Sequence, residues 1–109
     1  MKVKTAELSG RALDFATAMS IGWGDGGYRE RHLHILPEYS IGWMECGGLL
    51  TEYITGLALH CRREHWIASA RNHPTHTGKT AQEAICRAVV ASKLGDEVDI
   101  PDELMESTK

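Results

Sequence analysis

Residues 78–104 read GKTAQEAICRAVVASKLGDEVDIPDEL and contain a helix with signals at both of its ends. Thr80 and Glu83 form a Thr-x-x-Glu capping box, which can satisfy two free amides of the first turn reciprocally. Lys93 falls in the last turn, where a cation complements the helix dipole, and Gly95 stands where a left-handed C-cap is expected. The stretch therefore predicts a helix over 81–94.

This predicted helix is amphipathic, and an acidic tail, residues 96–109, follows it. The residues expected to face a sheet are Ala84, Ile85, Ala88, Val89 and Ser92. The residues expected to face outward are Gln82, Glu83 and Arg87. In the tail, acidic side chains enclose Val98, Ile100 and Leu104, which we expect to fold back onto the core.

Two further segments have helical spacing. A helix is predicted over 10–20, with Ser9 as its N-cap. Residues 39–53 are ambiguous, because Ser40 as an N-cap favours a helix, whereas a strand over 49–54 is the competing interpretation. The Gly-Gly pair in the middle of that helix would cost it about 1 kcal/mol per glycine relative to alanine. Of the two interpretations, we favour the helix.

The strand signals are short and lie mostly in the second half of the chain. Alternation of polar and apolar residues predicts strands over 57–62 and 66–70, joined by a tight antiparallel hairpin at 63–65. Residues 32–36 predict a short edge strand that a proline ends. Residues 71–79 contain asparagine, proline and glycine, which predict a loop.

Together these elements predict an α+β fold in which a small antiparallel sheet packs, sandwich-like, against N- and C-terminal helices. The 109 residues suit one domain, 1–109. The net charge of −3 argues against a dedicated nucleic-acid binder, whose affinity depends on neutralising phosphates. The three cysteines have no paired spacing, which is typical of reduced thiols in a cytoplasm. No apolar run approaches the roughly 20 residues that cross a bilayer, so we expect a cytoplasmic protein without a membrane partner.

Both ends of the chain are similar to one family. The first 18 residues, MKVKTAELSGRALDFATA, and residues 85–104, ICRAVVASKLGDEVDIPDEL, resemble the NinX-like proteins of lambdoid phages and prophages. More distantly, the first helix, the Trp66-x-Ala68 strand and the helix over 80–91 resemble the phage ABA-sandwich domain. The resemblance implies a phage accessory role in the bacterial host cell, and it supplies no catalytic residues.

The middle of the chain departs from this family. Where the family pattern leads us to expect Ser-Thr-Asp-Trp and then Gly-Gly-Pro-Ile-Ile, the chain has Tyr39-Ser40-Ile41-Gly42-Trp43 and Gly47-Gly48-Leu49-Leu50. The tryptophan and the glycine pair match, but the acid and the proline do not. The resemblance therefore assigns no site to this segment.

Metal binding and catalysis have little support. His32 and His34 would project from one face of a strand as a weak candidate pair for zinc or nickel, but no Cys-x-x-Cys spacing accompanies them. His60 and Cys61 are neighbours on a predicted strand and so face apart, which prevents them from acting as base and nucleophile. The glycine-rich stretch 22–27 follows a helix and is no phosphate-binding fingerprint. We expect no enzyme, no catalytic residue and no cofactor.

Nucleic-acid binding is a second alternative. If 49–54 is a strand, the element order is α-β-β-β-α, which is the order of the double-stranded-RNA-binding domain. Such a domain needs several lysines at the start of its last helix. Here only Lys79 lies there, with Arg87 further along, so we do not expect nucleic acid as the partner.

A binding module is the remaining interpretation. Trp23, Tyr28 and Trp43 lie in the least regular part of the chain, and aromatic residues are enriched at protein interfaces. The competing interpretation is that rings such as Trp43 and Trp66 complete a small core. We expect the partner to be a host or phage protein, bound through residues 23–31 and the segment at Trp43.

The alternative ligand is a small anion, such as a nucleotide signal, held at the interface of a homodimer. Arginines bind phosphate oxygens well because their planar guanidinium groups donate in pairs. The arginines that we expect to supply this charge are Arg29, Arg31, Arg62 and Arg71.

Overall fold

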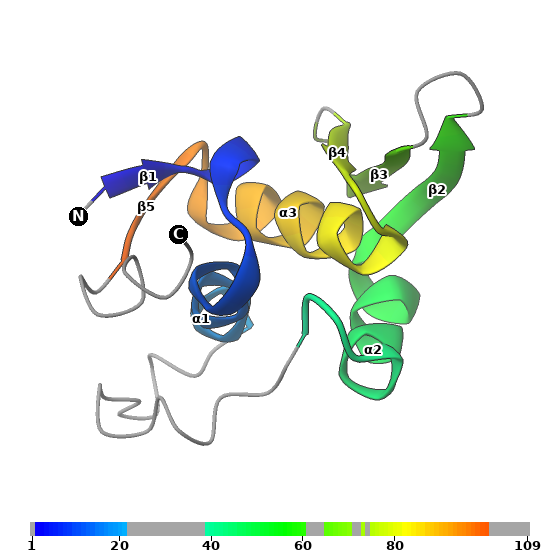
Figure 1. The fold of residues 1–109 in the computed structure, drawn as a ribbon, viewed down its shortest axis with the longest axis horizontal. Coiled ribbons are helices and arrows are strands. Elements are labelled where there is room, and N and C mark those ends of the chain that lie inside the picture. Colours follow the sequence, from blue (N-terminus) through cyan, green and yellow to red (C-terminus); the bar gives the residue numbers. More distant parts are fainter. Residues whose placement is uncertain (1, 22–38, 61–64, 71–72, 74, 101–109) are drawn as a thin grey trace.

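The computed structural model describes residues 2–21, 39–60, 65–70, 73 and 75–100. Its elements in order are β1 (Lys2–Lys4), the 3-10 helix η1 (Thr5–Glu7), α1 (Gly10–Ser20), α2 (Trp43–Tyr53), β2 (Ile54–His60), β3 (His65–Ala70), β4 (His76–Gly78), α3 (Ala81–Leu94) and β5 (Glu97–Asp99). Three helices pack with two small antiparallel sheets, which confirms the predicted α+β class (Figure 1).

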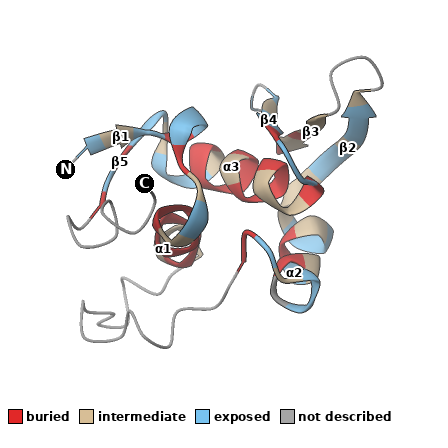
Figure 2. Ribbon diagram, in the orientation of Figure 1, coloured by how far each residue is buried: buried red, intermediate tan, exposed pale blue. Residues whose placement is uncertain are grey.

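Helix α3 lies at the centre of the fold (Figures 1 and 2). It contacts α1, α2 and the sheet formed by β2, β3 and β4. For this reason its buried surface is wider than the single stripe predicted from the sequence. Cys86 and Val90 are buried in addition to the expected residues, whereas Ser92 is half-buried. Because α3 packs against elements on several sides, it connects α1, α2 and the three-stranded sheet.

The ends of α3 are those that the sequence predicts. The Thr80 hydroxyl accepts a hydrogen bond of 3.1 Å from the Glu83 amide. The returning bond differs from the expected one, because the Glu83 carboxylate accepts at 3.0 Å from the amide of Lys79 rather than from that of Thr80. At the other end, Gly95 has the positive φ of 91° that favours glycine, and its amide donates to Ala91.

The segment 39–53 forms a helix, as favoured above, but its start differs. Helix α2 begins at Trp43 with Gly42 as the N-cap, so Ser40 is not the cap residue. Instead, the Ser40 amide donates a hydrogen bond of 2.7 Å to the buried carboxylate of Asp14 in α1. The competing strand over 49–54 is wrong, because residues 49–53 are helical and β2 begins only at Ile54.

The three-stranded sheet has the order β2-β3-β4, with antiparallel pairing throughout. Strands β2 and β3 pair antiparallel, as the predicted hairpin requires, but β2 begins three residues earlier than expected, at Ile54, with a register shift before Gly56. His65, predicted to lie in the turn, is the first residue of β3, and residues 61–64 lie outside the described residues. The loop predicted over 71–79 contains β4, which pairs with β3. The strand predicted over 32–36 lies outside the described residues.

The two ends of the described chain meet in the second sheet. Strand β1 pairs antiparallel with β5, and Val3 lies opposite Val98. Val98 and Ile100 are buried, as the fold-back of the tail requires, while Leu104 lies outside the described residues. Beside this sheet, the Thr5 hydroxyl donates a hydrogen bond of 2.7 Å to the Gly95 carbonyl, and this bond fixes the N-terminal segment to the end of α3.

Candidate binding surface

Three large apolar side chains lie exposed where the chain enters α2. Ile41 is 66% exposed, Trp43 54% and Met44 92%. We call these three residues the apolar surface. They lie within four positions of the sequence, so three exposed apolar side chains come from one short segment, whereas single exposed apolar residues are common on any protein.

The backbone under the apolar surface is anchored. Tyr39 and Ser40, immediately before it, are buried, and the Ser40 amide is bonded to Asp14. The carbonyl of Ile41 accepts a hydrogen bond of 3.3 Å from the Gln82 side chain of α3. The apolar side chains are thus presented from a segment that is tied to both α1 and α3.

Helix geometry explains why Trp43 is not in the core. The buried face of α2 carries Cys46 and Leu49. With about 100° between successive residues of a helix, Trp43 lies about a quarter turn from the centre of that face and Met44 lies nearly opposite it. The interpretation in which Trp43 completes the core is therefore wrong. Trp66, by contrast, is partly buried and packs against the core.

The structure places only one of the predicted binding residues. Trp43 is at the surface, as a binding residue must be. The other predicted binding residues, which lie outside the described residues, are Trp23, Tyr28, Arg29, Arg31, Arg62 and Arg71. The same holds for the histidines His32 and His34. Ile41 and Met44 were missed, because only the true start of α2 shows that they point away from the core.

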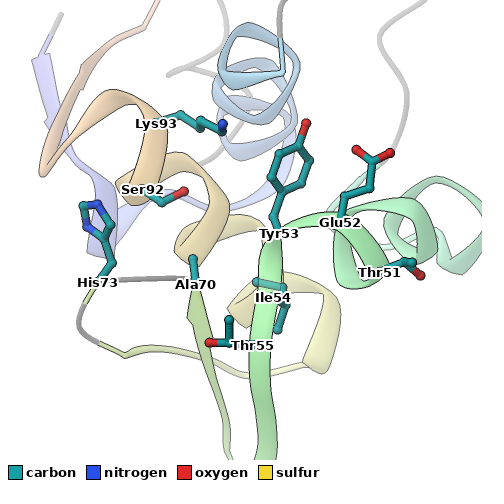
Figure 3. A pocket seen from close by; sticks show the side chains of 9 residues that line it. All are labelled: Thr51, Glu52, Tyr53, Ile54, Thr55, Ala70, His73, Ser92 and Lys93. Atoms are coloured by element: carbon teal, nitrogen blue, oxygen red, sulfur yellow. The ribbon is translucent and has the colours of Figure 1, made fainter.

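A cavity of about 480 Å³ lies where the end of α2, β2, β3 and the end of α3 meet. Its lining residues are Thr51, Glu52, Tyr53, Ile54, Thr55, Ala70, His73, Ser92 and Lys93 (Figure 3). The Lys93 ammonium lies 5.0 Å from the centre of the Tyr53 ring, a cation–π distance. In Figure 3, Lys93 and Ser92 lie on one side of Tyr53, and Glu52 and Thr51 lie on the other.

Three of the hydroxyl groups that line this cavity already donate their protons within the fold. Thr51, Thr55 and Ser92 donate their protons to the backbone carbonyls of Gly47, Ser69 and Val89 at 3.2, 3.2 and 2.8 Å. Each oxygen is left with lone pairs for a ligand. Lys93 and His73 are the basic groups of the lining. The cavity therefore has two basic groups on one side, the acidic Glu52 on the other side of Tyr53, and hydroxyl oxygens that can accept hydrogen bonds.

A second cavity, of about 530 Å³, lies beside the two-stranded sheet. Its lining residues are Lys4, Thr5, Ala6, His76, Asp96 and Glu97. Burial lowers the pKa of His76 from its ordinary value, although the nearby Asp96 charge acts in the opposite direction. Both basic and acidic groups line this cavity, so its lining does not favour a ligand of one charge.

Cys46 and Cys86 are buried, and their side chains are hydrogen-bonded to each other across α2 and α3. This hydrogen bond and burial raise the pKa of the Cys86 thiol far above its ordinary value. Because the thiolate is the reactive form and a raised pKa makes it scarce, Cys86 is a poor nucleophile. Both side chains are fully buried and fill the core between α2 and α3.

Arg87 is engaged inside the fold and does not face outward as expected. Its guanidinium donates to the Leu8 carbonyl at 2.9 Å and to the Thr77 carbonyl at 2.8 Å, and it lies 3.3 Å from the Glu83 carboxylate. These contacts occupy Arg87, the second of the two basic residues, after Lys79, that the double-stranded-RNA interpretation would assign to phosphate.

Within the described ranges, no cluster of three or more histidine, cysteine or acidic residues could hold a metal ion. Over the same ranges, no helix combines the length and the apolar character needed to span a membrane.

No protein-family model matches the chain, and the search of curated proteins found no relative.

Proposed function

We propose that this protein is a non-catalytic binding module that recognises a host or phage protein through the apolar surface. The observation that carries the proposal is the joint exposure of Ile41, Trp43 and Met44 on an anchored backbone. Tryptophan and methionine are enriched at protein interfaces. The resemblance of both chain ends to NinX-like proteins supports a phage accessory role in the bacterial cytoplasm.

The chemistry of the apolar surface defines the partner's face. The three side chains carry no charge, so their partner presents an apolar depression into which Trp43 and Met44 insert. Full burial of a side chain of this size contributes about 1.5–3 kcal/mol. Because the contact is apolar, its affinity depends little on salt, unlike a contact between charged surfaces.

A matched pair of variants tests this proposal. Met44→Asp removes the most exposed side chain of the apolar surface and places an acid in the first turn of α2, where the helix dipole favours it. Leu94→Gln changes an exposed apolar residue at the end of α3 and serves as the control. The immobilised proteins are incubated with lysate of phage-infected bacteria, and bound proteins are identified by mass spectrometry.

The expected result is a protein retained by the wild type and by Leu94→Gln but lost with Met44→Asp. Retention of the same proteins by all three baits would contradict the proposal. Retention that 0.5 M salt abolishes would also contradict it, because it would point to a charged contact.

A second candidate function is the binding of a small anion, which the cavity beside Tyr53 favours. Lys93 and His73 would meet a phosphate or carboxylate group, and the acceptor oxygens of Thr51, Thr55 and Ser92 would meet the ligand's amino or hydroxyl groups. A nucleotide carries both kinds of group. This cavity is lined by residues of one chain, whereas the small-anion site considered from the sequence would lie at a homodimer interface.

Titration calorimetry with AMP tests this candidate, with inorganic phosphate as the second ligand. Lys93→Gln should weaken AMP binding about tenfold, the effect of losing one charge-assisted contact. Lys79→Gln, an exposed lysine outside the cavity lining, is the control and should bind as the wild type does. Equal affinities for all three proteins would remove this cavity from consideration.

A further inference from the structure

Strand β2 is an edge strand whose outer side is free among the described residues. The sheet order β2-β3-β4 gives β2 one neighbour, β3. In Figure 1, no other described element lies beside β2 on its outer side. Within the part of the chain that the structure describes, no backbone hydrogen bond joins this side to another segment. A row of backbone donors and acceptors is thus available for pairing.

The sequence of β2 lacks the usual protection of an edge. Proteins commonly place lysine, proline or other charged residues on edge strands to prevent pairing with another chain. The strand reads ITGLALH and contains none of these. Its only irregularity is the register shift between Ile54 and Gly56, which leaves Gly56–His60 as a regular stretch of the ladder.

We propose that β2 pairs with β2 of a second copy of this chain, antiparallel, about a twofold axis at Ala58. This register aligns the regular stretch Gly56–His60 with itself. Ala58 then faces Ala58 of the other copy, and Gly56 faces His60. The two three-stranded sheets become one continuous six-stranded sheet, and the helices α3 of both copies lie on the same face.

The side chains of β2 favour this register. Leu59 is 56% exposed although it lies on a strand, and Leu57 on the same face packs against the core. Pairing about Ala58 places Leu59 of each copy opposite Leu57 of the other, so two apolar cross-strand pairs form at once. Such pairs are the main stabilising contacts of antiparallel strands. No like charges face each other, because the stretch contains no lysine, arginine, aspartate or glutamate and His60 faces Gly56 of the other copy.

Sedimentation equilibrium of the full chain tests the association. The wild type is expected to form a dimer, and Leu59→Lys and Ala58→Lys should each weaken it by about tenfold or more, because each substitution acts twice in a twofold interface. Met44→Lys, in the apolar surface, is the control and should dimerise as the wild type does. Circular dichroism checks that each variant is folded.

Cysteine cross-linking tests the register and does not depend on these lysine variants. In a Cys61→Ser background, Ala58→Cys should form a disulfide-linked dimer in oxidised glutathione, because the two side chains lie directly opposite. Leu59→Cys should cross-link more slowly, because a diagonal separates the two copies of residue 59. Cys46 and Cys86 remain in both proteins and are buried.

A monomer at all concentrations would overturn this inference. So would a dimer that is weakened by Met44→Lys but not by Ala58→Lys, since that result would assign self-association to the apolar surface. Faster cross-linking through residue 59 than through residue 58 would overturn the register. A monomeric wild type or a different register leaves the binding of a host or phage protein untouched, because the pull-down with Met44→Asp tests that binding separately. Weakening of the dimer by Met44→Lys alone would instead compete with the proposed function, because both would use the apolar surface.

Discussion

Asp14 and Ser40 are joined by a hydrogen bond of 2.7 Å between the Ser40 amide and the Asp14 carboxylate, across 26 positions of sequence. Asp14 is only 2% exposed, and its other oxygen lies 3.1 Å from the Arg11 guanidinium. This bond fixes the chain just before Ile41. It therefore sets the position of the apolar surface relative to α1.

Replacing Asp14 by alanine should lower the free energy of unfolding by about 1–3 kcal/mol, because the Ser40 amide would lose its acceptor in a buried site. Urea unfolding followed by circular dichroism measures this change. Thr51→Ala is the control, since it removes only an exposed hydrogen bond within α2 and should change stability by less than about 0.5 kcal/mol. Equal effects of the two substitutions would mean that the bond to Ser40 contributes nothing.

The pH dependence of stability should reveal the burial of the same carboxylate. Burial raises the pKa of Asp14 above its ordinary value of 3.8, although its bonds to Ser40 and Arg11 oppose the shift. As pH rises above 3.8, the unfolded chain loses this proton before the folded chain does, so Asp14 reduces stability progressively until its folded pKa is passed.

Asp14→Asn keeps an oxygen acceptor for Ser40 and removes the titration. The free energy of unfolding of Asp14→Asn minus that of the wild type should therefore be larger at pH 7 than at pH 3.5. Urea unfolding midpoints of both proteins at the two pH values measure this difference. A difference between the two proteins that stays constant with pH, or that changes in the opposite direction, would show that burial does not dominate.

Glycine at position 78 is required by a close approach between β4 and α3. A Cβ atom there would lie 2.5 Å from the Ala84 amide nitrogen and 2.9 Å from the Glu83 carbonyl carbon, both backbone atoms. Gly78→Ala should therefore destabilise the protein by about 1–3 kcal/mol, as overpacking does. Thermal unfolding measures the effect.

Gly48→Ala is the matched comparison and should have the opposite sign. A Cβ atom at Gly48 would meet nothing within 4 Å, and the residue lies inside α2. Alanine should stabilise the helix there by about 0.5–1 kcal/mol. If both alanine variants shift the unfolding temperature in the same direction, the contact between Gly78 and α3 is not what decides the first result.

Arg87→Lys tests whether one side chain connects three segments. The guanidinium donates to the Leu8 carbonyl before α1 and to the Thr77 carbonyl in β4, and an ammonium group cannot reproduce this planar arrangement. The free energy of unfolding should fall by about 1–3 kcal/mol, measured in urea. Lys93→Arg, a charge-conserving change at an exposed position, should leave it unchanged within about 0.5 kcal/mol.

The elements that could be predicted from sequence are those whose signals are local. The bounds of α3 follow from Thr80, Glu83 and Gly95, which lie within or next to the helix itself. The bounds of α1 follow in the same way from helical spacing. Alternation identified the hairpin of β2 and β3, although not the first residues of β2, because these continue directly from α2.

The features that escaped prediction depend on contacts between distant segments. Serine is a common N-cap residue, but the amide of Ser40 is bonded to Asp14, and the helix therefore starts at Trp43. Strand β4 is only three residues long, and pairing with β3 defines it. The exposure of Met44 and the cavity beside Tyr53 likewise follow from how α2 docks, which no local pattern encodes.

The pairing of β1 with β5 has a consequence for how the protein is made. The bond from Thr5 to Gly95 spans 90 positions, so β1 leaves the ribosome long before its partner β5 has been synthesised. Until then, Val3 remains without the valine that faces it in the finished sheet. A nascent chain stalled ahead of residue 97 should therefore expose residues 2–4 to proteases.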